Sequence, residues 1–286
     1  MIPDYAQPFF YQVPWRSASV HTGEHLGIQR GPGDEFSKHV SLVDYPDARR
    51  LDLRQTLRDP YEQVQVRVFK QEASSPLYAV CDLSSSMQFQ GQVRKVDTVK
   101  AVAASIACSA HDNSDLFGMV CYDHTVIPHL SLSPGHHAHQ SFATIPQLDD
   151  FRSIRRDGSG IVEAAGLLGQ QKGLVFWISD FHLPLSLIEH GLNLMANHQI
   201  IPIILWDPLE YQRLPRFGFG NLQDPETGEQ KTIFFRQAIR AQFVDMFEQR
   251  KQALDQLFAR FDIRPLYVDG RFDSALLSDY FEQLIH

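Results

Sequence analysis

One carboxylate and two hydroxyls follow an apolar run of the chain at alternate positions. Asp82, Ser84 and Ser86 lie at the end of the stretch LYAVCDLSSSM, residues 77–87. Their oxygens are hard ligands of the kind that magnesium and manganese prefer, and magnesium keeps several waters where few carboxylates are offered. For an isolated motif this short, a polar turn in which Asp82 caps the next helix is the more frequent explanation. Other parts of the sequence are needed to distinguish a metal site from a polar turn that caps a helix.

Two later stretches carry similar polar groups. Ser159 lies in a glycine-rich turn, RDGSG, directly before an expected apolar helix that ends at Leu168. Ser179 and Asp180 end a second apolar run, GLVFWISDF, at residues 173–181. Because open α/β sheets place their ligand sites at the carboxyl ends of their strands, we expect these groups to converge with Asp82. The three stretches together favour a metal site.

In order and context, the three stretches resemble the von Willebrand factor type A domain and its metal-ion-dependent adhesion site. That family has an Asp-x-Ser-x-Ser loop, a second loop that supplies a Thr, and a third that supplies an Asp. The resemblance implies Mg²⁺ or Mn²⁺ as the cofactor. Its ligands would be Asp82, Ser84, Ser86, Ser159 in the Thr position, and Asp180.

The elements that must position these residues alternate along the chain. Short apolar runs rich in β-branched and aromatic residues predict buried strands, and longer amphipathic or Ala-rich segments predict helices. Such alternation predicts an α/β fold with a doubly wound, mostly parallel sheet. The expected strands cover residues 77–81, 116–122, 125–132, 173–181, 200–206 and 263–268, and the expected helices 93–108, 136–145, 184–198, 236–261 and 274–285.

We expect residues 1–75 to form a separate N-terminal extension and residues 76–286 the α/β domain. The extension is polar and rich in Gly, Pro and Asp, and residues 64–69 (VQVRVF) alternate like a strand with one wet face. With the motif that follows, it resembles the bacterial domain of unknown function 58 family. The departures are Leu53, where that family usually has Trp, and Val43–Asp44, where it has Gly-Asp. The matching residues are Gly33, Glu35, Phe36, Asp44, Asp47, Arg49, Asp52, Arg67, Phe69 and Glu72.

A β-hairpin is expected within residues 214–235, inserted before the long helix. Its apolar arms flank the sequence DPETGE, in which Asp-Pro and Thr-Gly are turn signals. A similar element occurs at this place in the domain of unknown function 58 family. We hypothesise that the hairpin pairs with the strand over residues 64–69.

Composition excludes several classes of protein. The 286 residues are 43% hydrophobic and carry a formal net charge of -8, which argues against general nucleic-acid binding. The first fifteen residues lack the pattern of a secretory signal, and the longest apolar run is far shorter than the ~20 residues of a membrane span. The three cysteines, which lack CxxC spacing, are expected to be buried thiols in a reducing compartment. We therefore expect a cytoplasmic protein. The cysteines are Cys81, Cys108 and Cys121.

Other polar clusters have less specific explanations. The histidines at 136, 137 and 139 lack a nearby Cys or carboxylate at ligand spacing, so a solvated loop is more frequent than a metal site. A charged N-terminal set could equally dock a partner or pin an irregular segment to the domain. That set is Asp44, Asp47, Arg49, Arg50, Asp52 and Arg58.

Catalysis has weaker support than binding. Haloacid-dehalogenase-type phosphatases need a second Asp where this chain has Ser84, and the chain has no nucleophile elbow or phosphate-binding loop after a strand. His182 is the one residue near Asp180 that could serve as a base. The sequence therefore predicts a metal-dependent interaction module, not an enzyme, with a metal-dependent phosphoesterase at Asp82 and Asp180 as the alternative.

The family resemblance also implies a kind of partner. Members of the domain of unknown function 58 family are typically encoded beside AAA+ ATPases of the MoxR type, and such pairs are thought to act in chaperone-like assembly or maturation of other proteins. The expected partner is therefore a MoxR-type ATPase, and an acidic residue of a protein partner is expected to complete the metal's coordination.

Overall fold

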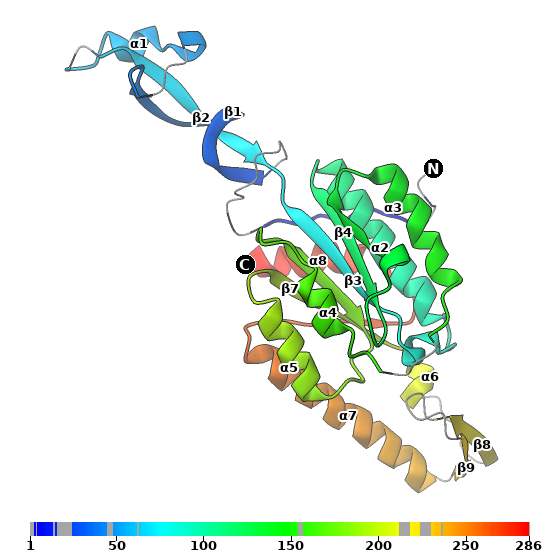
Figure 1. Cartoon of the computed structure of the whole chain (residues 1–286). Coiled ribbons are helices and arrows are strands. Elements are labelled where there is room, and N and C mark those ends of the chain that lie inside the picture. The colour runs from blue at the N-terminus through cyan, green and yellow to red at the C-terminus, as the bar shows by residue number, and fades with distance from the viewer. Residues whose placement is uncertain are drawn as a thin grey trace. The chain divides into compact units, whose positions relative to one another are not determined.

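In the computed structural model, six strands form one mostly parallel sheet (Figure 1). Their order across the sheet is β10-β7-β6-β3-β4-β5, and β5 pairs antiparallel with β4. The central strands are apolar and buried along nearly their whole length, as parallel strands covered on both faces must be. The α/β class and the mostly parallel sheet are thus confirmed. The strands are β3 (Pro76–Asp82), β4 (Leu116–Tyr122), β5 (Leu132–Gly135), β6 (Leu174–Ser179), β7 (Gln199–Trp206) and β10 (Leu266–Asp269).

The structure describes residues 3, 5–13, 15, 25–44, 48–61, 63–153, 157–211, 218–223, 230–235 and 237–285.

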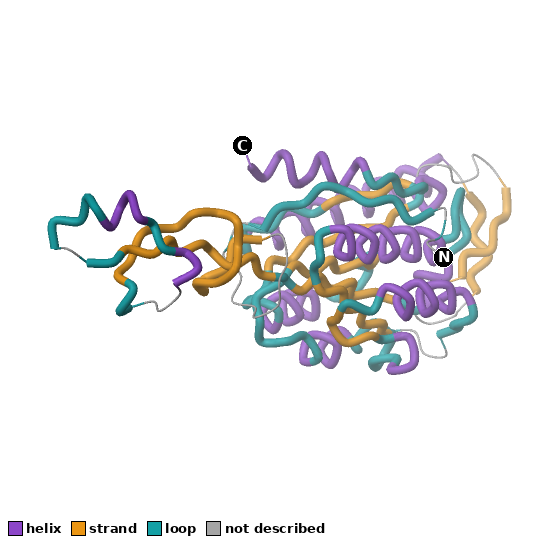
Figure 2. Tube along the Cα trace, turned by 90° about the horizontal axis from the view of Figure 1, so that it is seen from above, coloured by secondary structure: helices purple, strands orange, loops and turns teal. Residues whose placement is uncertain are grey.

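Helices lie on both sides of the strands in the view from above (Figure 2). None of the helices in these described ranges is long and apolar enough to cross a membrane. The α-helices of this unit are α2 (Lys95–Asp112), α3 (Ala138–Thr144), α4 (Ile161–Gly166), α5 (Leu185–Leu194), α6 (Pro208–Tyr211), α7 (Gln237–Ala259) and α8 (Ala275–Ile285).

One predicted strand is wrong. Residues 125–132 do not form a continuous strand, because the 3-10 helix η3 (Pro128–Leu130) interrupts them and β5 starts only at Leu132. Pro128 has no backbone N–H for a strand ladder, and its fixed φ suits the first turn of a helix. This unit has two further short 3-10 helices among its described residues. They are η2 (Ser85–Gln88) and η4 (Ile145–Asp149).

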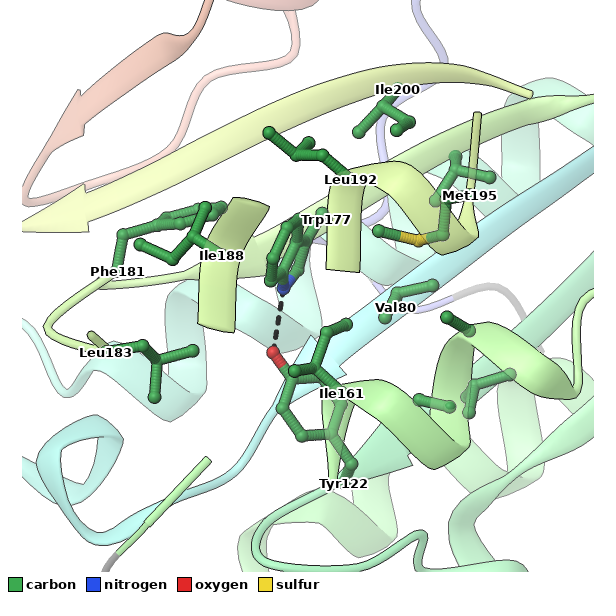
Figure 3. Packing of buried hydrophobic residues seen from close by; sticks show 14 of the residues in the cluster. Val80, Tyr122, Ile161, Trp177, Phe181, Leu183, Ile188, Leu192, Met195 and Ile200 are labelled. Atoms are coloured by element: carbon green, nitrogen blue, oxygen red, sulfur yellow. Dashed lines mark hydrogen bonds between the residues drawn. The ribbon is translucent and has the colours of Figure 1, made fainter. Parts of the chain in front are cut away.

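A large hydrophobic cluster packs one face of the sheet against α4, α5 and α7. Figure 3 shows the part of this cluster around α4 and α5. At its centre, Trp177 of β6 is fully buried, and its indole Nε1–H donates to the Tyr122 hydroxyl at 2.7 Å. A buried indole needs such a partner, because its donor would otherwise lose hydration without compensation. The same Trp177 ring lies against Phe181, with ring centroids 4.8 Å apart. The core thus reaches the loop that follows β6.

The chain divides into two compact units, and the division does not follow the predicted boundary throughout. Ser75 ends one unit and Pro76 begins the other, but residues Met1–Gln12 group with the α/β unit and not with the N-terminal extension. Phe9 explains the difference, because it is buried and packs against Phe176 of β6 and Phe281 of α8.

The second unit, Val13–Ser75 with Asn113–Asp115, is built on a two-stranded antiparallel ribbon. Its strands are β1 (His25–Ser41) and β2 (Gln65–Ala73), and the short helices η1 (Ala48–Arg50) and α1 (Leu53–Thr56) lie between them in the chain. The predicted strand over residues 64–69 therefore pairs with β1, and the hypothesis that it pairs with the inserted hairpin is wrong. The hairpin instead pairs its own arms, β8 (Gly218–Gln223) with β9 (Gln230–Phe235). Its DPETG turn, residues 224–228, and Asp47 lie outside the described residues.

Asp52 ties this second unit together. Its carboxylate accepts hydrogen bonds from Arg67 Nε at 2.6 Å and from the Gln55 backbone N–H at 3.1 Å, and it lies 3.1 Å from His39 Nε2. The Arg67 hydrogen bond, followed by those of Gln55 and His39, holds the pKa of Asp52 well below its ordinary value. Asp52, one of the six residues of the charged N-terminal set, therefore stabilises the unit in which it lies.

We expect the stability of the second unit to fall in acid because of Asp52. A carboxyl whose pKa is depressed by folding stabilises the fold above its unfolded pKa of about 3.9 and loses that contribution as the pH falls further. Asp52→Asn should therefore be less stable than wild type at pH 7, and the difference should shrink below about pH 4. Urea unfolding across this pH range measures both effects. Asp44→Asn, at an exposed position of the same unit, is the matched control. A stability difference independent of pH would contradict the assignment.

Candidate metal centre

Two neighbouring strands of the sheet bring the predicted carboxylates together. β3 and β6 pair in parallel with Cys81 opposite Ile178, so Asp82 ends its strand beside Ser179 and Asp180. Along the chain, the strands after β3 extend the sheet toward β5, whereas those after β6 extend it toward β10. The strand order therefore reverses between β3 and β6, the place where open α/β sheets bind their ligands.

Asp82 is fully buried and its two oxygens have separate donors. The Ser84 backbone N–H donates to Oδ1 at 2.8 Å, and the Ser179 hydroxyl donates to Oδ2 at 2.7 Å. Ser84 Oγ also lies 3.3 Å from Ser86 Oγ, so all three members of the first loop form one polar cluster. Burial, together with the negative charge of Asp180, raises the pKa of Asp82 to about 6 despite these hydrogen bonds. The ionised carboxylate is therefore short of compensating positive charge.

Asp180 is equally buried but has a cation of its own. Lys95 Nζ lies 3.0 Å from Asp180 Oδ2, and the exposed fractions of the two side chains are 4% and 1%. The His182 backbone N–H donates to Oδ1 at 3.2 Å, and the Ser86 hydroxyl also bonds this carboxylate. Burial alone would raise the pKa of Asp180, but the charges of Lys95 and His182 and these hydrogen bonds outweigh burial and lower it. Ser86 thereby links the first loop to the third.

The loop of Ser159 lies next to Asp82, although its hydroxyl is engaged elsewhere. A Cβ on Gly158 would lie 3.5 Å from Asp82 Oδ2, and Gly160 N–H donates to the Asp123 carbonyl at 3.1 Å. Ser159 itself is exposed. Its Oγ lies 2.5 Å from Asp157 Oδ1 and 3.3 Å from the carbonyl oxygen of His124, a loop residue after β4. The structure thus brings Asp82, Ser84, Ser86 and Asp180 into one cluster and the backbone of the Ser159 loop beside it.

The backbone of this second loop has no room for a side chain at Gly160. A Cβ there would lie 2.8 Å from the Asp123 carbonyl oxygen and 2.9 Å from backbone atoms of Thr125. This close approach explains why glycine stands directly after Ser159.

The third loop is held from two sides. Trp206 Nε1–H, from β7, donates to the Asp180 carbonyl at 2.8 Å. The Arg250 guanidinium, from α7, donates to the carbonyls of Phe181 and Leu183. Phe181 adopts a positive φ of 53°, which is uncommon for a residue with a large side chain and is maintained by these contacts and by the core beneath it. The position of Asp180 therefore depends on β7, α7 and Trp177 together.

The sequence did not indicate that Lys95 would pair with Asp180, that the Ser179 hydroxyl would donate to Asp82, or that Asp157 would bond Ser159. Ser179 adjoins Asp180 in the second apolar run, so its position was available from the sequence. Asp157 is two residues from Ser159, but its hydrogen bond depends on the local turn. Lys95 begins α2, thirteen positions after Asp82, and nothing in its local pattern distinguishes it from an exposed helix residue.

The donor set fits a small hard cation. Two carboxylates and two hydroxyls converge at one edge of the sheet, and with the Lys95 ammonium the buried charge still sums to -1. Oxygen donors with so few carboxylates suit magnesium or manganese better than zinc, which takes nitrogen and sulfur. Within the described part of the chain, no three His, Cys, Asp or Glu residues form a metal-binding group, and the histidines at 136, 137 and 139 are exposed. The hydroxyls would therefore be essential ligands here.

Comparisons with known proteins point to bacterial relatives. The family model described as "Protein of unknown function DUF58" matches residues 45–253. An uncharacterized protein of Mycobacterium bovis is 26% identical over 226 residues, which cover 77% of this chain and 70% of that protein. A Paracoccus denitrificans protein named "Uncharacterized protein in moxR 3'region" is 28% identical over 101 residues, which cover 35% of this chain and 96% of that protein.

One solved structure gives a distant likeness. The conserved hypothetical protein BatB from Bacteroides thetaiotaomicron is 14% identical, with a TM-score of 0.44, and the match covers 74% of this chain and 99% of BatB.

Proposed function

The chain belongs to the family described as protein of unknown function DUF58, and we propose that it is a metal-dependent protein-interaction module with a von Willebrand factor type A-like, doubly wound domain. The observation that carries the proposal is the buried pair Asp82 and Asp180 at the point where the strand order reverses, joined by the hydroxyls of Ser84 and Ser86. This is the arrangement that the resemblance to a metal-ion-dependent adhesion site predicts for these residues.

Asp82, Ser84, Ser86 and Asp180 would hold Mg²⁺ or Mn²⁺, and Ser159 would join them directly or through a water. Two carboxylates and a few hydroxyls do not fill an octahedral shell, so at least one position stays open to solvent. The ion would supply local positive charge at that position, where an acidic residue of a partner could form a charge-assisted bond. Because the chain carries a net charge of -8, this local attraction has to overcome repulsion at long range.

We propose a MoxR-type AAA+ ATPase as the partner, acting with this protein in the assembly or maturation of other proteins in the cytoplasm. Two lines support this choice. The family resemblance implies such a pairing, and the Paracoccus denitrificans relative is named for its place in the moxR 3' region.

Magnesium should stabilise the folded protein. At a hundredfold excess over the dissociation constant, the free energy of unfolding should rise by about 2.7 kcal/mol by mass action. Asp82→Asn should remove this increment, because the amide lacks the negative charge that binds the metal. The substitution keeps the shape of the side chain, so packing changes little. Urea unfolding with Mg²⁺, Mn²⁺ or chelator measures it.

The matched control for that experiment is Asp115→Asn. Asp115 is also buried, but it directly precedes β4 and its carboxylate accepts the Ser75 N–H at 2.6 Å, away from the carboxyl ends of the strands. The control should retain the full metal increment whatever its own stability. Equal stability of the wild type with and without both metals would contradict the site.

Binding of the ATPase tests the second half of the proposal. Removal of the metal with chelator and the Asp82→Asn substitution should each weaken binding, and their effects should not add, since both remove the same ion. Equal affinity in chelator would contradict metal-dependent binding. Hydrolysis of a generic phosphoester with Mg²⁺ or Mn²⁺, lost in Asp82→Asn, would instead favour the alternative phosphoesterase.

A further inference from the structure

The buried ion pair between Lys95 and Asp180 is the feature of the cluster that a simple metal site does not need. The ammonium and the carboxylate are 3.0 Å apart and almost fully covered. The Lys95 Nζ also lies 5.8 Å from the centroid of the ring of Phe89, the residue that follows η2. A lysine so placed occupies the cation-binding side of one of the two carboxylates.

The charges do not allow the lysine and a divalent ion to share the site at little cost. Asp82 and Asp180 together carry -2 when both are ionised. The Lys95 ammonium leaves a buried charge of -1, a dication in its place leaves zero, and both cations together leave +1. Like charges so close in a buried setting repel strongly. Neutrality is reached when the dication binds and the ammonium leaves.

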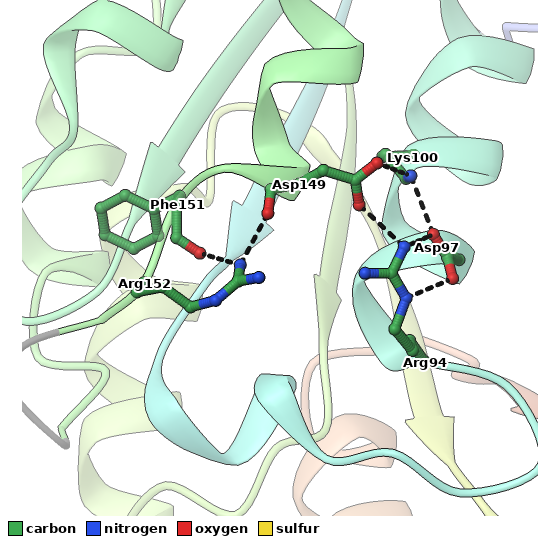
Figure 4. A network of polar contacts seen from close by, with 6 residues as sticks. All are labelled: Arg94, Asp97, Lys100, Asp149, Phe151 and Arg152. Atoms are coloured by element: carbon green, nitrogen blue, oxygen red, sulfur yellow. Dashed lines mark hydrogen bonds and ion pairs between the residues drawn. The ribbon is translucent and has the colours of Figure 1, made fainter.

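Ion pairs hold the start of the helix that carries Lys95. When the metal replaces the ammonium at Asp180, it is therefore the Lys95 side chain that moves. Arg94, one residue earlier, binds Asp97 through Nε at 2.8 Å and through an amino group at 2.7 Å, and it also reaches Asp149 at 3.0 Å (Figure 4). Lys100 bonds the same two carboxylates. The first turns of α2 are thereby tied to η4, whereas Lys95 has a flexible four-carbon stem that can withdraw.

We propose that Lys95 is an internal counter-ion that competes with the divalent metal for Asp180, so that metal loading displaces its ammonium from the site. This inference rests on the proposed metal-dependent function and adds the regulation of the same site. In the metal-free protein, Lys95 neutralises Asp180 and joins the start of α2 to the loop after β6. In the metal-loaded protein, the dication neutralises the two carboxylates and the released ammonium moves out of the buried cluster.

Calorimetric titration with Mg²⁺ tests the competition directly. Lys95→Met, which keeps an unbranched side chain one atom shorter and removes its charge, should bind Mg²⁺ roughly tenfold more tightly than wild type. Lys95→Arg keeps a competing cation and should not show this gain. Lys100→Met is the matched control, since it removes another lysine of α2 that is paired with Asp97 and Asp149, and its Mg²⁺ affinity should equal that of wild type.

Chemical labelling of lysine amines in the wild-type protein gives a readout that needs no variant. Mass spectrometry should find Lys95 protected in chelator and modified faster in saturating Mg²⁺. The labelling of Lys172, an exposed residue just before β6, should stay constant. Protection of Lys95 that persists while Mg²⁺ binds, or equal Mg²⁺ affinity of wild type and Lys95→Met, would overturn the displacement and leave the metal site intact. If neither protein binds Mg²⁺ or Mn²⁺, the proposed metal site fails and the inference fails with it. Binding by Lys95→Met alone would support the inference in its strongest form.

Discussion

Asp180→Ala is expected to lower the free energy of unfolding of the metal-free protein by about 3 kcal/mol, the low end of the cost of breaking a buried ion pair. The substitution leaves the Lys95 ammonium without the carboxylate that lies 3.0 Å from it. It also removes the repulsion between Asp180 and Asp82, which offsets part of the loss. Urea unfolding in chelator measures the change without interference from a bound metal.

A double-mutant cycle separates the ion pair from general damage to the loop. Asp180→Ala combined with Lys95→Met should be more stable than Asp180→Ala alone, because the orphaned charge is gone. Asp279→Ala, at an exposed position of α8, should change the stability by less than about 0.5 kcal/mol and serves as the control. If the double variant is no more stable than Asp180→Ala, Lys95 does not depend on Asp180 for its burial.

The sheet could be predicted from the sequence because its strands are short apolar runs with little polar interruption. β4 was expected at residues 116–122, the bounds that the structure has. The N-terminal β1 was not expected, because Gly31, Pro32 and Gly33 interrupt any alternation within it. The ribbon accommodates that stretch with a register shift between Gly31 and Phe36. Periodicity cannot reveal a strand whose pairing is irregular.

Some residues of the candidate site could likewise be placed from the sequence, and others could not. Asp82 and Asp180 could be placed together because each lies at the carboxyl end of a parallel strand, and these ends share one edge of a sheet. Lys95 could not be placed, since its contact with Asp180 spans 85 positions and depends on how α2 packs. The hydroxyl of Ser159 could not be placed either, because Asp157 competes for it locally. The strand ends that carry the two carboxylates were predictable, whereas the partners of individual polar groups depended on tertiary packing.

Trp177 is one of the residues that link the candidate site to the hydrophobic core. Trp177 packs against Phe181, which directly follows Asp180 and has a positive φ of 53°. Such a backbone conformation persists only where its surroundings hold it. Here the indole lies beneath the loop and is itself fixed by its hydrogen bond to Tyr122 (Figure 3). Loss of the indole should therefore affect both the stability of the unit and the geometry of the carboxylates.

Trp177→Ala is expected to lower the free energy of unfolding by about 3–5 kcal/mol, because it removes a fully buried aromatic side chain and leaves a cavity. Tyr122→Phe keeps the packing but leaves the indole N–H without an acceptor, so it should cost about 1–3 kcal/mol. Because the loop of Phe181 loses its support only in Trp177→Ala, that variant should also bind Mg²⁺ more weakly than Tyr122→Phe. Urea unfolding in chelator and calorimetric titration with Mg²⁺ measure the two effects. Unchanged Mg²⁺ affinity in a folded Trp177→Ala protein would show that Trp206, Arg250 and Phe258 hold the Asp180 loop without the Trp177 indole.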